Sequence, residues 1–163
     1  MALRKDAPVH EDRRPRVVEH TPGVVRTEVG EMTGPAYIAF TILRLGFIVA
    51  PIVMGADKFL GILTDDWTKY LWSGIPQLTG IEAGTLMLGV GAIEIVAGVL
   101  VAFSARHFAW LVAAWLGLII VNLVLQGQWL DVAMRDFGLM LGAIALAFLA
   151  RADHLAKEHP EAA

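Results

Sequence analysis

Four blocks of apolar residues, each about as long as a membrane-spanning helix, constrain this chain more than any other feature. They cover residues 36–56, 81–103, 108–125 and 132–150, with short polar connections between them. A helix of about 20 residues, rising 1.5 Å per residue, crosses the ~30 Å hydrocarbon core of a bilayer. Charged residues make up only 18% of the chain, below the roughly 25% usual in soluble domains. We therefore predict an all-α fold, a four-helix transmembrane bundle.

The basic residues outside these blocks predict the orientation of the bundle. An N-terminal tail (1–35) carries six arginines and lysines, the connection at 104–107 adds Arg106, and a C-terminal tail (151–163) adds two more. The opposite side holds only three basic residues, and positive charge favours the cytoplasmic side. We expect both termini in the cytoplasm and a membrane domain at 36–150. Because its charges balance and it has few aromatic residues, the tail 1–35 is expected to be largely disordered or to bind a partner.

The first outer connection, residues 61–80, is the longest and is rich in aromatic residues. Thr64 is a candidate cap for a short helix on which Trp67, Tyr70 and Leu71 share one face. Tryptophan and tyrosine are enriched at headgroup depth, so we expect a short interfacial helix. A lid over a site between the long helices is the alternative interpretation.

Arg44 and Glu94 are charged residues inside two consecutive apolar blocks. Counted from the cytoplasmic ends of their spans, they lie about 12 and 13.5 Å deep at helical rise. A lone charge at mid-membrane costs roughly 2.5–3.5 kcal/mol on insertion scales. We therefore predict an intramembrane Arg44–Glu94 ion pair. It either fixes the helix register or serves a polar headgroup, a quinone or a proton path.

A second set of polar residues gathers near the outer ends of the spans. The fourth block reaches spanning length only if it includes two of them, Arg135 and Asp136. Interfacial charge at helix ends is one interpretation, and a polar vestibule in which Lys58 and Arg135 receive an anionic or carbonyl group is the other. The candidate outer site comprises Asp57, Lys58, Glu82, Asn122, Arg135 and Asp136.

Several kinds of chemistry find no support in the sequence. There is no cysteine, and all five histidines lie outside the apolar blocks, so neither a thiolate metal site nor an intramembrane bis-histidine haem site is expected. The net charge of −3 and the absence of a nucleic-acid motif argue against DNA or RNA. No catalytic residue can be named, no intrinsic cofactor is expected, and a quinone is the candidate ligand. Trp115, in mid-span, is expected to pack against neighbouring helices.

Three motifs resemble those of the DoxX-like family of bacterial membrane proteins. Arg44, Gly55 and Lys58-Phe59 resemble its first-helix pattern, and the stretch from Gly91 to Gly98, with Glu94 inside it, resembles its second-helix G-x-x-E-x-x-A-G signature. Residues 135–138, Arg-Asp-Phe-Gly, resemble the opening of its last helix. The resemblance covers residues 36–150. It implies a four-helix protein of the bacterial cytoplasmic (inner) membrane that is associated with redox metabolism.

Two functional hypotheses follow. The first is a non-catalytic accessory subunit or anchor of a redox-linked membrane complex, in contact with the lipid bilayer and protein partners. The alternative is a small transporter or proton-linked channel that uses Arg44 and Glu94, and because four helices are few for such a path it requires a homo-oligomer. A self-contained enzyme ranks last, since no nucleophile–base arrangement is evident.

Overall fold

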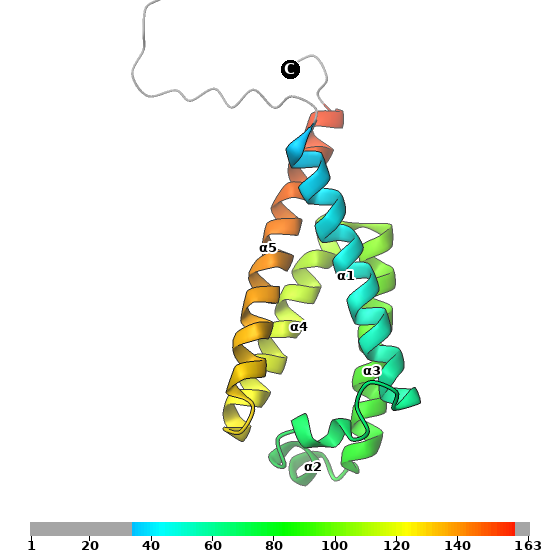
Figure 1. The fold of residues 1–163 in the computed structure, drawn as a ribbon, viewed down its shortest axis with the longest axis vertical. Helices are drawn as coiled ribbons and strands as arrows, with labels where there is room; N and C mark the ends of the chain where they lie inside the picture. Colours follow the sequence, from blue (N-terminus) through cyan, green and yellow to red (C-terminus); the bar gives the residue numbers. More distant parts are fainter. Residues whose placement is uncertain (1–33, 159–163) are drawn as a thin grey trace, which may run out of the picture.

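In residues 34–158, which the computed structural model describes, all regular elements are helices (Figure 1). The four long ones are α1 (Pro35–Leu60), α3 (Ala83–Phe103), α4 (Ala105–Gln126) and α5 (Leu130–Glu158). All four are long and apolar enough to cross a membrane. The chain is thus a multi-pass membrane protein, and the predicted all-α bundle of four spans is confirmed.

The helix boundaries follow from local sequence signals. Pro35 occupies the first turn of α1, where its missing N–H costs no hydrogen bond. Gly61 and Gly127 end α1 and α4 in the left-handed region, with φ of 62° and 75°, a conformation that glycine adopts without strain. A single extended residue, Ser104, separates α3 from α4. Helix α5 continues through residues 151–158, which the sequence analysis assigned to the C-terminal tail. The predicted N-terminal tail lies outside the described residues except for Gly34 and Pro35.

The long helices are arranged as two antiparallel pairs. Helix α1 packs along α3, and α4 packs along α5, with much less contact between one pair and the other. The pairs converge where α1 begins and α5 ends and diverge toward the opposite end (Figure 1). Small residues allow this convergence, and the buried core there contains Phe40, Phe47, Ala97, Val101, Ala105, Ala109, Val112, Ala113, Ala143, Leu146, Ala147 and Ala150.

Glycines set the register between α1 and α3. A Cβ atom built on Gly55 would lie 2.6 Å from the carbonyl oxygen of Gly91, and one on Gly91 would lie 2.7 Å from that of Gly55. Farther along, a Cβ on Gly98 would lie 2.8 Å from the carbonyl oxygen of Ile48. Such close backbone approach is how helices pack in lipid, which supplies no hydrophobic drive between them.

The start of α1 and the end of α5 lie at the same end of the bundle and project past the α3–α4 turn (Figure 1). At the other end, the segment between α1 and α3, residues 61–82, crosses below the diverging pairs. It contains a short 3₁₀ helix, η1 (Trp67–Tyr70), and a short α-helix, α2 (Gly74–Thr79). This 61–82 segment therefore closes the open end of the bundle.

Candidate functional site

A buried ion pair joins Lys58 on α1 to Glu94 on α3. The Lys58 Nζ lies 2.6 Å from the Glu94 Oε2, and the two side chains are only 5% and 12% exposed. The pair forms one turn from the Gly55–Gly91 contact, where the two backbones are closest. The Trp67 ring, whose centroid is 4.1 Å from the Lys58 Nζ, covers the ammonium group. Lys58 is thus held by a carboxylate and an aromatic face together.

The predicted Arg44–Glu94 pair is wrong. The Arg44 guanidinium instead donates a 2.6 Å hydrogen bond from Nη2 to the carbonyl oxygen of Ala102. The prediction aligned the ends of the two spans, but the glycine contacts place Arg44 opposite the last turn of α3. Carbonyl groups in that turn lack intrahelical partners and carry the negative end of the helix dipole, so they attract a guanidinium. Arg44 therefore lies near the end of a span rather than at its centre.

Asp136, at the start of α5, brings a second carboxylate toward the Lys58–Glu94 pair. It interacts electrostatically with both Lys58 and Glu94 from the opposite helix pair. Its neighbour Arg135 is exposed and also acts on it electrostatically. Among the described residues, the ion pair in this region joins Lys58 to Glu94, and Asp136 adds a second carboxylate that acts on both at longer range.

Asp57 organises the 61–82 segment. Its carboxylate accepts hydrogen bonds from the backbone N–H groups of residues 62, 63 and 64, at 2.8, 2.7 and 3.2 Å, and from the Trp67 indole at 2.9 Å. The residue is 3% exposed. Asp57, predicted as part of the candidate outer site, therefore has no carboxylate oxygen free for a ligand, since both oxygens hold the segment that follows α1.

Asn122 fastens the same segment to α4. Its Oδ1 accepts from the Trp72 N–H at 2.9 Å, and its Nδ2 donates to the Tyr70 carbonyl at 2.7 Å. Gln126 and the Trp129 indole both donate to the carbonyl of Lys69, at 2.6 and 2.9 Å. The 61–82 segment therefore bridges the two helix pairs, tied to α1 by Asp57 and to α4 by Asn122.

Two of the predicted outer residues stand apart from this network. Glu82 is exposed immediately before α3, and its side chain caps no backbone group. Arg135 is exposed on α5. The structure thus brings Asp57, Lys58 and Asn122 to the 61–82 segment and its surroundings, and leaves Glu82 and Arg135 on the surface.

The short helix in the outer connection begins differently from the prediction. Asp66 rather than Thr64 caps it, accepting from the Thr68 N–H at 2.8 Å and from the Thr68 hydroxyl at 2.6 Å. These hydrogen bonds, with Lys69 nearby, hold the pKa of Asp66 below its ordinary value of 3.8. Trp67 and Tyr70 do come together, with ring centroids 5.8 Å apart. Thr64 instead donates its N–H to Asp57.

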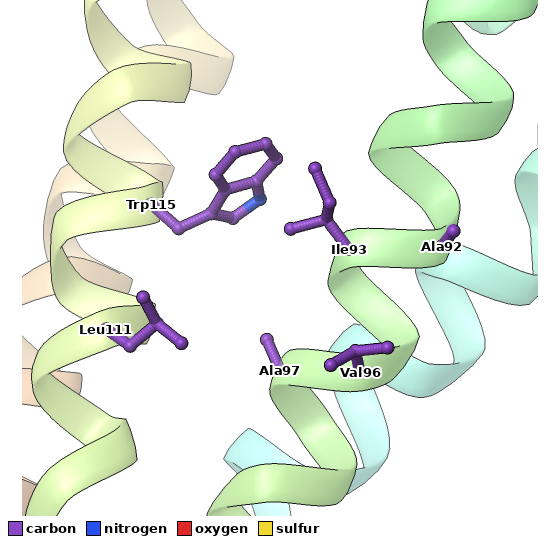
Figure 2. A pocket seen from close by; sticks show the side chains of 6 residues that line it. All are labelled: Ala92, Ile93, Val96, Ala97, Leu111 and Trp115. Carbon is purple, nitrogen blue, oxygen red and sulfur yellow. The ribbon is translucent and has the colours of Figure 1, made fainter.

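A separate apolar groove lies between α3 and α4 (Figure 2). It encloses about 260 Å³. Trp115 and Leu111 on α4 face Ile93 and Ala97 across it, as Figure 2 shows. The remaining lining residues are Ala92 and Val96. The predicted role of Trp115 is packing against neighbouring helices, and the sequence signal for a groove here is limited to the small residues Ala92 and Ala97 on α3.

Within residues 34–158, no three histidine or acidic side chains are grouped so that they could hold a metal ion. No family model, curated protein or solved structure matches the chain.

Proposed function

We propose that this chain is a non-catalytic accessory subunit or anchor of a redox-linked complex in the bacterial cytoplasmic membrane, with both termini in the cytoplasm. In this role it supplies a stable helical platform for partner subunits and for a quinone or lipid beside them. The proposal needs no reacting group on the chain itself.

The main support for the proposal is that the polar side chains in the interior bind one another and the backbone. Lys58 and Glu94 neutralise each other, the Asp57 carboxylate holds four donors, and the Asn122 amide uses both its oxygen and its nitrogen. A reactive site keeps groups free for a substrate, whereas the charged and amide groups of this network bind one another and the backbone. The described buried side-chain atoms that lack a partner, Arg44 Nε, Trp115 Nε1 and Gln126 Oε1, lie outside these contacts. Such saturated networks fix helix positions in membranes, where an unpaired polar group is costly.

The outer surface of the bundle supports the same proposal. Between 17% and 33% of the residues in the most apolar stretch of each span are buried. The rest of each helix is available to lipid and to other membrane subunits. Lipid contact alone requires such an apolar surface, and on this bundle the same surface is available for packing against partner subunits.

The redox link rests on the resemblance to DoxX-like proteins. Part of the set of residues that carries the resemblance meets in space, because Gly55 contacts Gly91 and Lys58 binds Glu94, with Asp136 acting on both charges at longer range. Arg44 lies apart from this contact, beside Ala102. The contact between the first-helix and second-helix motifs supports the resemblance.

The test is purification of the tagged full chain from its native membranes in mild detergent, followed by native electrophoresis and mass spectrometry. We expect it to migrate with membrane oxidoreductase subunits, and an unrelated four-helix protein carrying the same tag not to do so. Recovery of the chain alone, in a preparation that keeps other membrane complexes intact, would refute the proposal.

One observation favours a second candidate, a small proton-linked channel or transporter that works as an oligomer. Lys58 lies near the two carboxylates Glu94 and Asp136, which would carry the proton in this candidate, and the exposed Arg135 is a second cation that acts on Asp136. Proteoliposomes that contain the chain should then conduct protons, and Glu94→Gln should abolish the flux while Glu82→Gln leaves it unchanged. Flux equal to that of empty liposomes rules this candidate out.

A further inference from the structure

The Arg44 guanidinium has hydrogen-bond donors to spare and no anionic partner. Its Nη2 donates to the Ala102 carbonyl oxygen at 2.6 Å, and its Nε is closed off from the surroundings. Its Nη1 makes no hydrogen bond within residues 34–158 and is accessible from outside the bundle. No carboxylate in the same range lies within ion-pair distance of the guanidinium. A charge beside hydrocarbon is costly unless it is paired, so this group requires an anion that the described part of the chain does not supply.

Arg44 lies at the level of the α3–α4 turn. Its partner Ala102 is the last residue but one of α3, and only Ser104 separates α3 from α4. Arg44 precedes Leu60, the last residue of α1, by 16 residues, which is about 24 Å at helical rise. Helical side chains tilt toward the N-terminus, so the guanidinium reaches farther still toward the end where α1 begins. It therefore lies close to the edge of a hydrocarbon core that is ~30 Å thick.

The α3–α4 turn is set back from the ends of the other two long helices. The start of α1 and the end of α5 project past it (Figure 1). The projecting part of α1 is apolar on its outer face, where Ile38 and Ile42 are 58% and 64% exposed. The turn is polar, because Ser104 forms it and Arg106 follows in the first turn of α4. Arg44, Ser104 and Arg106 thus make up a recessed step at this end of the bundle, beside an apolar wall.

The surface around the recessed step restricts what can occupy it. Leu45 and Phe103, next in the chain to Arg44 and Ala102, are 56% and 81% exposed, so hydrocarbon must cover the surface beside the guanidinium. A phospholipid supplies acyl chains for this surface together with a phosphate for the guanidinium. Inorganic phosphate offers the same anion but cannot cover the apolar part. Arg106 adds a second cation at the turn and favours a lipid with net negative charge over one whose headgroup carries its own ammonium.

We propose that the recessed step binds one anionic phospholipid, with two phosphate oxygens accepting from Nη1 and Nη2 of Arg44. These nitrogens form a planar fork that matches a phosphate, and each still has an N–H to donate. The Ala102 carbonyl fixes the orientation of the fork through its bond to Nη2. The site lies at the opposite end of α1 from the Lys58 network, and it stands whether or not the chain joins a complex.

The test is native mass spectrometry of the purified full chain in detergent micelles, titrated with phosphatidylglycerol or with phosphatidylcholine. The wild type should bind one phosphatidylglycerol about fivefold more tightly than phosphatidylcholine. Arg44→Met keeps a long apolar side chain and removes the charged donors, so binding should weaken about tenfold to a hundredfold. Arg151→Met is the matched control, because Arg151 is exposed on α5 and its loss changes the net charge equally. Its affinity should stay within about twofold of the wild type.

A second readout locates the phosphate. In bilayers, the dipolar coupling between lipid ³¹P and ¹⁵N-labelled arginine side chains should report a short contact in the wild type. The contact should disappear in Arg44→Met and persist in Arg151→Met. Thermal unfolding verifies that each variant is folded. Arg44→Lys keeps the charge without the fork, which makes it the variant to use if Arg44→Met does not fold, and it should bind about threefold to tenfold more weakly than the wild type.

Four results would overturn the proposal. The first is binding of phosphatidylglycerol to folded Arg44→Met, or to Arg44→Lys in its place, as tightly as to the wild type. The second is an equal loss of affinity in Arg151→Met, which would indicate general charge attraction. The third is equal affinity for phosphatidylcholine. The fourth is displacement of the lipid by an excess of inorganic phosphate, which would identify a site for the free anion.

Discussion

Gly55 and Gly91 approach so closely that a Cβ on either residue would lie within 2.7 Å of the other's carbonyl oxygen. The atom that the added Cβ would meet is a backbone carbonyl oxygen in each case, so no side-chain rotation can relieve an added methyl group. The two helices must separate instead. This contact fixes the register of α1 on α3 and, with it, the position of every charge in the interior.

Gly91→Ala should therefore destabilise the bundle by about 1–3 kcal/mol, the usual range for overpacking a well-packed contact. Gly89→Ala on the same helix is the control, because a Cβ at Gly89 meets nothing within 4 Å and alanine favours helix over glycine by about 1 kcal/mol. Thermal unfolding in detergent should show a lower midpoint for Gly91→Ala and an equal or higher one for Gly89→Ala. Equal midpoints for both variants would contradict the close contact.

The Lys58–Glu94 pair should show strong coupling in a double-mutant cycle. Either Lys58→Met or Glu94→Gln leaves one buried group without its partner, and breaking a buried pair from one side costs roughly 3–5 kcal/mol. The double variant should be more stable than the sum of the two single losses predicts. A parallel cycle of Arg44→Ala with Glu94→Gln should be additive within about 0.5 kcal/mol, since these residues share no contact. Strong coupling in the second cycle would restore the pair expected from sequence.

Asn122→Ala should release the 61–82 segment from α4. The substitution removes one acceptor and one donor, leaving the partly buried Trp72 N–H and Tyr70 carbonyl without their partners, at a cost of about 1 kcal/mol for each lost hydrogen bond. Hydrogen exchange should accelerate at residues 67–79 and remain unchanged in the middle of α4. Val121→Ala, at a neighbouring position that is 56% exposed, serves as the control and should leave exchange in the segment unaffected.

The Asp66 cap should make the outer segment sensitive to acid. Its native pKa lies below the ordinary value of 3.8, so the charged form is favoured by folding. Its stabilisation is complete well above pH 3.8 and is lost as the pH falls through the lower native pKa. The difference in unfolding midpoint between the wild type and Asp66→Ala should thus be present at pH 7 and shrink below pH 3.8. A difference that is constant over this range would show that the carboxylate charge does not matter to the cap.

The spans were predictable from sequence because a bilayer requires about 20 apolar residues per helix, whatever the packing. Register was not predictable by the same argument. Hydropathy ended the first span at residue 56, whereas α1 continues to Leu60 and carries Lys58 on a helical surface beside Glu94. A lysine side chain is long enough to reach inward from the end of a span. Lys58, which the hydropathy pattern places at the membrane edge, is therefore the residue that pairs with Glu94 in the interior.

The residues of the candidate site could be predicted from the sequence, but their partners could not. Polar residues in or beside spans are rare, and this rarity indicates a special role for Asp57, Lys58, Glu94 and Asn122. The side chains of all four form an ion pair or hydrogen bonds in the buried or partly buried parts of the bundle. Their partners were not deducible, since Asp57 and Asn122 bind backbone groups of a segment whose path depends on tertiary structure. Because α1 and α3 are antiparallel, aligning Gly55 with Gly91 does not set Lys58 opposite Glu94. The lysine side chain reaches the carboxylate by running back along α1, where its Nζ also donates to the Met54 carbonyl.

The division into two pairs also affects how the protein is made. Each densely packed pair, α1 with α3 and α4 with α5, consists of spans that are neighbours along the sequence. The first pair can therefore associate in the bilayer while the ribosome is still translating the second. Only the smaller contact between the two pairs has to form after the whole chain has been made. Two separately expressed fragments divided at Ser104 should on this basis each insert as a stable hairpin and reassemble when present together.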